Sequence, residues 1–289
     1  MPLNQLWETL HNGVILNERI FNNLAEVQTE VTNLRKTYSG MARNGGGPNF
    51  SDAKVREAYA LAYHPGHAHA YLQIMLNQGL GDSLIQGLGA QSSVGVLGAG
   101  AGAETLAFFS FFANRGFRPD GVTLSLIDQA DWAVQRQQCC IAKVQEITGM
   151  LPKKIDSFIQ DVVSPDALSL LSRFVPSNDL IFCPAIYTEL EAKKKGHDFI
   201  NDVCRLMKSQ SKILVIDQAE VNGFAAACVE FAGIPQMRLI HQGNMTLRVP
   251  SPPAGSFAST VLDGVPYQNA NGRIARTKYH FSWVLLQKN

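Results

Sequence analysis

The sequence of 289 residues lacks any apolar run near the roughly 20 residues that a membrane-spanning helix requires. Its first residues form neither a cationic leader nor an apolar signal segment. Its charges nearly cancel, because 25 Lys and Arg face 24 Asp and Glu for a formal net charge of +1. Such a chain has no strong overall field for nucleic acid or for an anionic membrane. We therefore predict a cytoplasmic protein with neither a membrane partner nor a nucleic-acid partner.

The cysteines are too few and too irregularly spaced for a disulfide framework or a zinc site. They are Cys139, Cys140, Cys183, Cys204 and Cys228. Their number is odd and no CxxC pair occurs, so reduced and partly buried thiols are the simpler interpretation. His64, His67 and His69 have no acid or cysteine at a useful local spacing. We predict no metal site.

The N-terminal part of the chain has helical periodicity. Apolar residues recur every three or four positions over residues 3–38, and a glycine-rich loop follows at 44–49. A second helix is expected from the capping pair Ser51-Asp52 to Pro65, which should end or kink it, and helix resumes over 67–80. We predict a helical lid or substrate region over residues 1–90 and a catalytic domain over residues 91–289.

From residue 92 onward, short β-branched segments alternate with helical ones. The predicted strands are 93–98, 122–128, 154–161, 179–186 and 212–218, and the predicted helices are 104–116, 132–149, 164–175, 189–209 and 224–233. This alternation predicts a parallel sheet covered on both faces. Two further strand-like segments, 237–249 and 275–287, flank a Pro- and Gly-rich connection and are expected to close the sheet as an antiparallel pair. The predicted fold is α/β, a Rossmann-like doubly wound sheet of seven mostly parallel strands.

A glycine-rich turn, Gly98-Ala99-Gly100-Ala101-Gly102, stands between the first predicted strand and a helix that begins near Glu104. Glycine permits a sharp turn and close contact of a ligand with the main chain. The helix start offers unpaired N–H groups and a partial positive charge. The turn therefore predicts a nucleotide-binding site.

The ends of the next two strands supply candidate contacts for an adenosine. Asp128 ends the second strand, where an acid can accept hydrogen bonds from both ribose hydroxyls. Trp132 could cover the adenine or simply pack on the sheet. Asp161 could meet the adenine amino group or serve as a helix cap, and its neighbour Val162 could meet the ring face.

Polar and aromatic residues after the fourth and fifth strands are candidates for the reaction centre, because ligands bind beyond the carboxyl ends of such strands. Tyr187 could orient an acceptor, and Asp217 could act as a base. Glu220 and Asn222 could contact the acceptor. From the N-terminal region, His64 could serve as a base and Tyr63 as a substrate contact; alternatively, His64-Pro65-Gly66-His67 is an ordinary helix break with exposed histidines.

Four stretches resemble the class I S-adenosylmethionine (SAM)-dependent methyltransferases over about residues 90–289. They are VGVLGAGAGAETLAF, LSLIDQADW, DLIFCPAIYTEL and the final strand pair. The resemblance implies that SAM is the cofactor. The residues it assigns to the cofactor are Gly98, Ala99, Gly100, Gly102, Glu104, Asp128, Gln129, Trp132, Asp161, Val162 and Pro184.

One position departs from the family. Members usually carry an acid two residues before the first glycine to hold the methionine amino group, whereas this chain has Val96. Glu104 or N-terminal residues would then have to hold that group. The stretch YALAYHPGHAHAYLQIML is also similar to methyltransferases of the mitochondrial small-ribosomal-subunit type, which keeps an rRNA substrate open.

The leading hypothesis is a SAM-dependent methyltransferase that acts on a small-molecule acceptor. The alternatives are attack at another carbon of the sulfonium (aminocarboxypropyl transfer or cyclisation), an NAD-dependent oxidoreductase using Gly98-x-Gly100-x-x-Ala103, and a non-catalytic scaffold. Lys193-Lys194-Lys195 is the only basic run, and a solvated helix face is its simplest explanation. A homodimer stays open.

Overall fold

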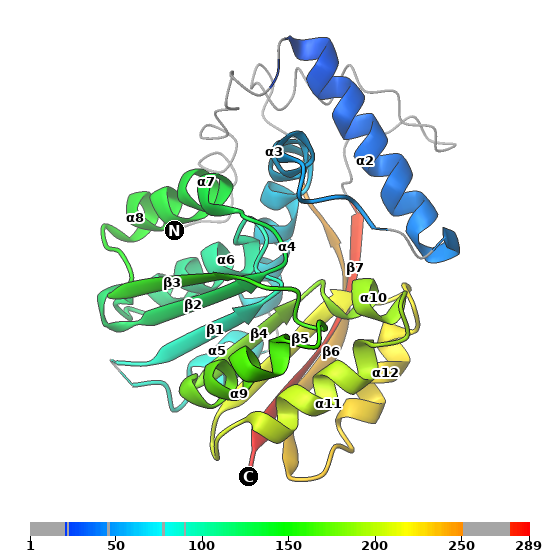
Figure 1. The fold of residues 1–289 in the computed structure, drawn as a ribbon. Coiled ribbons are helices and arrows are strands. Elements are labelled where there is room, and N and C mark those ends of the chain that lie inside the picture. The colour runs from blue at the N-terminus through cyan, green and yellow to red at the C-terminus, as the bar shows by residue number, and fades with distance from the viewer. Residues whose placement is uncertain (1–20, 22, 45–46, 77–78, 90, 251–277) are drawn as a thin grey trace.

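A computed structural model describes residues 21, 23–44, 47–76, 79–89, 91–250 and 278–289 (Figure 1). Most of the predicted connection at 250–272 and the predicted helical residues 3–20 lie outside these ranges. Among the described helices, none combines the length and the apolar character that crossing a bilayer requires.

One seven-stranded sheet forms the centre of the molecule, with the strand order β3-β2-β1-β4-β5-β7-β6. The strands are β1 (Ser93–Leu97), β2 (Thr123–Asp128), β3 (Lys154–Ile159), β4 (Leu180–Pro184), β5 (Lys212–Gln218), β6 (Met237–Arg248) and β7 (Lys278–Lys288). The first five run parallel, and β7 runs antiparallel to both β5 and β6. The predicted fold class is confirmed, with one refinement: β7 lies between β5 and β6, so β6 runs parallel to the first five strands.

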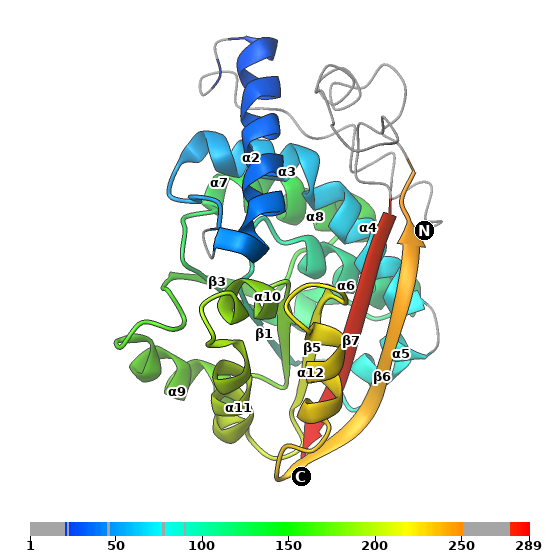
Figure 2. The ribbon, with the colours of Figure 1, turned by 90° about the vertical axis from the view of Figure 1, so that its right-hand side faces the viewer.

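Helices cover both faces of the sheet, as the predicted alternation requires. One face carries α4 (His64–Leu76), α5 (Leu80–Ile85), α6 (Ala103–Asn114) and α8 (Ala142–Thr148). The other carries α9 (Ala167–Ser177), α11 (Gly196–Leu206) and α12 (Phe224–Phe231). Figures 1 and 2 show these last three helices together on one side of the sheet.

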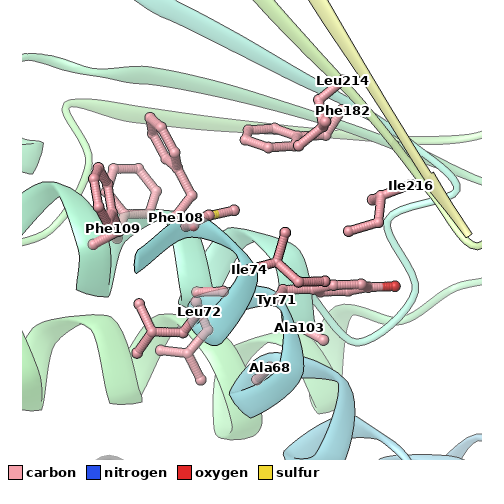
Figure 3. Packing of buried hydrophobic residues seen from close by; sticks show 14 of the residues in the cluster. Ala68, Tyr71, Leu72, Ile74, Ala103, Phe108, Phe109, Phe182, Leu214 and Ile216 are labelled. Carbon is pink, nitrogen blue, oxygen red and sulfur yellow. The ribbon is translucent and has the colours of Figure 1, made fainter. Parts of the chain in front are cut away.

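Helix α4 is part of the main core. Its Tyr71 and Ile74 lie opposite Phe182 of β4 and Leu214 of β5, and all four are buried in one cluster (Figure 3). Burying a large apolar side chain contributes about 1.5–3 kcal/mol, so α4 contributes substantially to the stability of the sheet. The boundary near residue 90 stays a prediction, but α4 and α5, which precede it, share one core with strands that come after it.

Helices α2 (Leu24–Asn44) and α3 (Ala53–Ala62) form a smaller cluster of their own. The predicted start of α3 is confirmed, since the Asp52 carboxylate caps the helix by accepting a hydrogen bond from the Lys54 N–H at 2.8 Å. The predicted break is confirmed too. Helix α3 ends at Ala62, and Pro65 occupies the first turn of α4, where a missing N–H costs nothing.

Two helices predicted as continuous are interrupted. Residues 132–149 form α7 (Ala133–Arg136), a π-helical turn η2 (Gln137–Ile141) and α8. Residues 189–209 form α10 (Tyr187–Glu191) and α11, and the lysine run 193–195 lies in the loop between them rather than on a helix. The Glu191 carboxylate causes the second break, because it accepts hydrogen bonds from Gly196 N and His197 N and starts α11 there.

Candidate functional site

A cavity of about 250 Å³ lies at the carboxyl ends of the central strands. Its lining comes from the segments after β1, β2, β3 and β4, and from α2, α3 and α4 on the opposite side. The strand order reverses between β1 and β4, and open α/β sheets bind ligands outside the strand ends at such a reversal. The cavity therefore lies where this kind of fold binds its ligands.

Every residue that the sequence assigned to the cofactor lines this cavity. The glycine-turn residues are Gly98, Ala99, Gly100, Gly102 and Glu104, and the strand-end residues are Asp128, Gln129, Trp132, Asp161, Val162 and Pro184. The structure thus brings together residues from four separate segments. Their contacts with a ligand stay a prediction.

The glycine turn requires glycine for two distinct reasons. Gly98, Gly100 and Gly102 have φ angles of 77°, 44° and 87°, a region that side chains disfavour. Contacts add to this at two of them. A Cβ at Gly98 would stand 3.0 Å from Ile186 Cδ1, and one at Gly102 would stand 2.9 Å from the Cβ and Sγ of Cys140. The Arg136 Nε donates to the Gly100 carbonyl oxygen at 2.8 Å and supports the turn further.

The Asp128 carboxylate connects the end of β2 to the glycine turn. Its Oδ2 accepts a hydrogen bond from Gly100 N at 2.8 Å. Its Oδ1 accepts from Ala130 N at 3.0 Å and from Trp132 Nε1 at 2.9 Å. Each carboxylate oxygen has two lone pairs, so Oδ2 keeps the capacity to accept a ligand hydroxyl. The acid is fixed in place at the cavity wall.

The aromatic and acidic candidates for the adenine end have different environments. Trp132 is almost fully buried and packs against Phe50 with ring centroids 5.1 Å apart, so it serves as a core residue as well as a cavity wall. Asp161 is exposed, and its Oδ1 accepts from Val163 N at 3.1 Å within a local turn, so the alternative of a helix cap is wrong. Helix α9 itself starts after Asp166. Gln160, which the sequence did not single out, also lines the cavity.

Glu104 is a buried acid at the first turn of α6. Burial raises its pKa to about 7, although hydrogen bonds such as the one from Thr105 Oγ1 at 2.9 Å oppose the shift. Val96, which stands at the position of the family's usual acid, is completely buried in the sheet core. Glu104 is therefore a carboxyl of the glycine-turn segment that can face a ligand amino group.

Tyr187 was predicted to lie at the reaction centre, but it does not line the cavity. It is absent from the described residues that line the cavity, and its ring packs against Phe224 at 5.1 Å and Phe231 at 5.6 Å. Burial raises the pKa of its hydroxyl to about 12. Helix α10 begins at this residue, and its ring lies within the core beneath α12 instead of at the strand ends.

Asp217 and Asn222 hold the segment after β4 instead of lining the cavity. Asp217 accepts hydrogen bonds from Thr188 N at 2.9 Å and from Thr188 Oγ1 at 3.0 Å. The Asn222 Nδ2 donates to the Thr188 carbonyl oxygen at 2.7 Å. These contacts give both residues a positioning role, because they fix the start of α10. The predicted role of Asp217 as a base in direct contact with ligands has no support in this geometry.

Glu220 and Tyr63 also lie outside the cavity lining. Glu220 is exposed and its Oε1 lies 3.0 Å from His280 Nδ1. Tyr63 belongs to the α2–α3 cluster, where its ring stacks on Tyr59 at 5.5 Å and contacts Tyr38 at 5.2 Å. It stands behind the wall residues, since Tyr38 and Tyr59 line the cavity while Tyr63 does not.

His64 lines the cavity, as predicted, and so does His67. The alternative of exposed histidines at a helix break is wrong, because His64, His67 and His69 are all buried. The Tyr59 hydroxyl lies 3.3 Å from His67 Nδ1, so these two groups share a hydrogen bond. His69 lies away from the cavity, and burial lowers its pKa to about 4. Among the described residues, no group of three His, Cys, Asp or Glu could hold a metal ion.

Sequence reasoning gave no site role to three tyrosines of the lining and missed one acid. Tyr38, Tyr59 and Tyr71, from α2, α3 and α4, line the side of the cavity opposite the strand ends. Glu189 of α10 lines it as well, and its pKa is raised to about 8, first by burial and then by the charges of Asp128 and Asp217. The signal for Glu189 was present in DLIFCPAIYTEL, where it follows the strand end by one helical turn.

Comparison with known proteins gives distant structural likenesses. No protein-family model matches the chain, and no curated protein matches it in sequence. The magnesium protoporphyrin IX methyltransferase of Synechocystis PCC 6803, solved with bound SAM, is 12% identical with a TM-score of 0.42, covering 91% of this chain and 97% of that one. The N-methyltransferase NodS of Bradyrhizobium japonicum, in complex with S-adenosylhomocysteine (SAH), is 12% identical with a TM-score of 0.41, covering 87% and 98%. The precorrin-6y C5,15-methyltransferase of Geobacter metallireducens is 13% identical with a TM-score of 0.40, covering 75% and 88%.

These neighbours are methyltransferases, but the likenesses are weak. Their TM-scores stay below 0.5 and their identities below 25%. The sheet order of this chain itself shows the α/β fold.

Proposed function

We propose that the chain binds SAM in this cavity and transfers its methyl group to a small-molecule acceptor. The observation that carries the proposal is the convergence of the glycine turn and Asp128, joined by the 2.8 Å hydrogen bond from Gly100 N to Asp128 Oδ2. A nucleoside needs both features in one place, bare main chain for close approach and an acid for the ribose hydroxyls.

The residues present suit each part of SAM. Asp128 would accept from the ribose hydroxyls, and Gln129, Asp161 and Val162 would surround the adenine. Glu104 would take the methionine amino group, the role that Val96 cannot fill. A Cβ at Gly100 would meet no described heavy atom within 4 Å, which leaves open space against the main chain of the turn. Bound SAM would supply an electrophilic methyl carbon, and the chain must align an acceptor with it and exclude water.

The aromatic wall favours a small acceptor. Tyr38, Tyr59 and Tyr71 line the cavity opposite the strand ends, and all three rings are carried on helices. Aromatic rings reduce the access of water to a displacement reaction, and a pocket of this kind suits a compact substrate more than an extended strand of RNA. His64 lies on the same wall and is a candidate for proton transfer.

Calorimetric titration with SAM and SAH tests the proposal. Asp128→Ala should weaken SAH binding by about 1–3 kcal/mol, the scale of a lost hydrogen bond to a charged group. Because Asp128 also supports the glycine turn, thermal unfolding must first show that the variant is folded. Asp131→Asn is the matched control, since Asp131 lies in the same loop, is exposed and caps α7 through Ala133 N at 3.0 Å.

Two results would count against the proposal. Absence of heat on titration of the wild type with SAM and SAH would remove the cofactor assignment. If turnover yields methylthioadenosine instead of SAH, SAM remains the cofactor but the reaction is attack at another carbon of the sulfonium, not methyl transfer.

A further inference from the structure

The carboxylate of Glu189 lines the cavity without a protein partner. No hydrogen bond or ion pair joins its side chain to any residue in the described ranges. The neighbouring acids of the cavity differ in this respect, because Asp128 accepts three hydrogen bonds and Glu104 accepts one from Thr105. A partly buried carboxylate with no partner is unfavourable unless a ligand supplies one.

Glu189 lies on α10, beyond the end of β4. It lies one helical turn after Ile186. The Ile186 side chain lies beside Gly98, 3.0 Å from where a Cβ of that residue would stand. Thr188, the residue before it, is fixed by Asp217 and by Asn222. The carboxylate therefore has a defined position beyond β4 and close to the glycine turn.

Aromatic rings face Glu189 across the cavity. Burial is the main cause of the raised pKa of Tyr59, and the charge of Glu189 is the next one. Glu189 likewise raises the pKa of Tyr38, after burial and Tyr59. Both rings line the same cavity as the carboxylate. An acid beside aromatic faces is the combination that binds an organic cation.

The other ionisable groups around Glu189 leave an excess of negative charge. Asp128 at the end of β2 and Asp217 in β5 raise its pKa, and Lys193, in the exposed loop after α10, lowers it. Glu104 and Asp161 line the same cavity, as do His64 and His67 of α4. Lys193 lines the cavity too and is the one Lys or Arg among its described lining residues, against the four acids Glu104, Asp128, Asp161 and Glu189. A cationic ligand would offset this excess of acids.

We propose that Glu189 binds the acceptor, that the acceptor is a primary or secondary amine, and that Glu189 takes its proton before methyl transfer. The inference rests on the proposed function. The amine enters as an ammonium ion, and one N–H proton passes to a Glu189 carboxylate oxygen. The freed nitrogen lone pair then forms the bond to the methyl carbon as the carbon–sulfur bond breaks. The electron pair of that bond stays on sulfur, which becomes neutral, and the methylated nitrogen carries the positive charge.

The proton step agrees with the environment of Glu189. A carboxyl whose pKa lies near 8 takes a proton from an ammonium ion far more readily than one at the ordinary value of 4.5. The same shift predicts that ammonium binding weakens as the pH falls below about 8, because the carboxyl then becomes neutral.

The test is titration of the SAH complex with phenethylamine and n-hexylamine, using 2-phenylethanol and 1-hexanol as neutral isosteres. We expect an amine to bind the wild type at least tenfold more tightly than its alcohol at pH 8.5. Glu189→Gln should remove this preference and should leave the dissociation constant of SAH within twofold. Between pH 8.5 and 6.5, amine affinity should fall about tenfold or more in the wild type and by at least threefold less in Glu189→Gln, where Glu104 is the remaining cavity acid with a pKa in this range. Glu146→Gln, an exposed site on α8 outside the cavity lining, is the control.

Each contrary result has a distinct meaning. Failure of both amines to bind, equal binding of amine and alcohol, or an unchanged preference in Glu189→Gln overturns the amine assignment. A loss of SAH affinity in Glu189→Gln would place this acid on the cofactor, which also overturns the assignment but leaves the proposed function intact. Failure of the wild type to bind SAH is measured separately and defeats the proposed function itself.

Discussion

At the residue scale, the glycine turn is constrained by what lies behind it as much as by its own backbone. Gly102 has a φ of 87°, and Cys140 of the π-helical turn η2 occupies the space that a side chain there would need. Gly116 has a similar φ of 76°, but a Cβ there would meet no heavy atom of the described residues within 4 Å. A side chain at either position would meet similar backbone strain, but only at Gly102 would it also meet steric crowding.

Gly102→Ala should lower the free energy of unfolding by about 2–5 kcal/mol, from left-handed strain of about 1–2 kcal/mol and overpacking of about 1–3 kcal/mol. Gly116→Ala, the matched control, should cost only the strain, about 1–2 kcal/mol. Urea unfolding of both variants measures the difference. Equal losses at the two sites would show that Cys140 does not confine the turn.

At the element scale, β5 determines where α10 begins. Asp217 of β5 holds Thr188 through both its N–H and its hydroxyl, and the second of these contacts measures 3.0 Å. Asp217 and Glu189 thus have different roles. Asp217 positions α10, and α10 places Glu189 in the cavity lining.

Thr188→Val keeps the shape of the side chain and removes the hydroxyl donor from a completely buried carboxylate. It should lower the free energy of unfolding by about 1–3 kcal/mol, the cost of an unmade hydrogen bond to a buried charged group. Thr246→Val in β6, where the side chain is exposed, should change stability by less than about 0.5 kcal/mol. Chemical denaturation of both variants provides the measurement, and similar values for the two would contradict the positioning role of Asp217.

The sequence predicted the elements well where local pattern decides them. Alternating β-branched segments located all seven strands, and Asp52 and Pro65 marked the limits of α3. It failed where distant contacts decide. The packing of Tyr187 against Phe224 and Phe231 joins α10 to α12 and cannot be read from local spacing. The break before α11 was missed for another reason: Glu191 accepts from Gly196 N and His197 N, a local contact that helical periodicity does not reveal.

The candidate site divides in the same way. Backbone-based features such as the glycine turn and the acid at the end of β2 follow from chain order, because parallel strands end at one edge of the sheet. The direction of the side chains after β4 does not follow from chain order. The sequence therefore indicated Tyr187 as a site residue where the structure has Glu189. The tyrosine wall depends on how α2, α3 and α4 pack across the sheet ends, which no local signal specifies.

At the scale of the whole molecule, buried acids around the cavity make stability depend on pH. The folded-state pKa of Glu104 is about 7, against 4.5 for an unperturbed glutamate. Between these values the folded state holds a proton that the unfolded state releases, so this contribution to stability is present below pH 4.5 and is lost as the pH rises through about 7.

Glu104→Gln should therefore become more stable relative to the wild type as the pH rises from 4.5 to 8, by up to about 3 kcal/mol. Unfolding in urea at both pH values measures the change. Asp166→Asn is a suitable control, since Asp166 is exposed and makes no side-chain cap to α9 within the described structure. A difference between Glu104→Gln and the wild type that stays constant with pH would contradict the raised pKa.

The place of β7 dictates an order of assembly. Among the described strands, β6 pairs with β7 alone, although β6 comes first in the chain. Tyr279 and Phe281 of β7 also contact the ring of His67 on the cavity wall. A nascent chain that has emerged from the ribosome only as far as β6 thus has neither a complete sheet nor a complete wall. The support behind His67 on the cavity wall therefore depends on the pairing of β7 with β5.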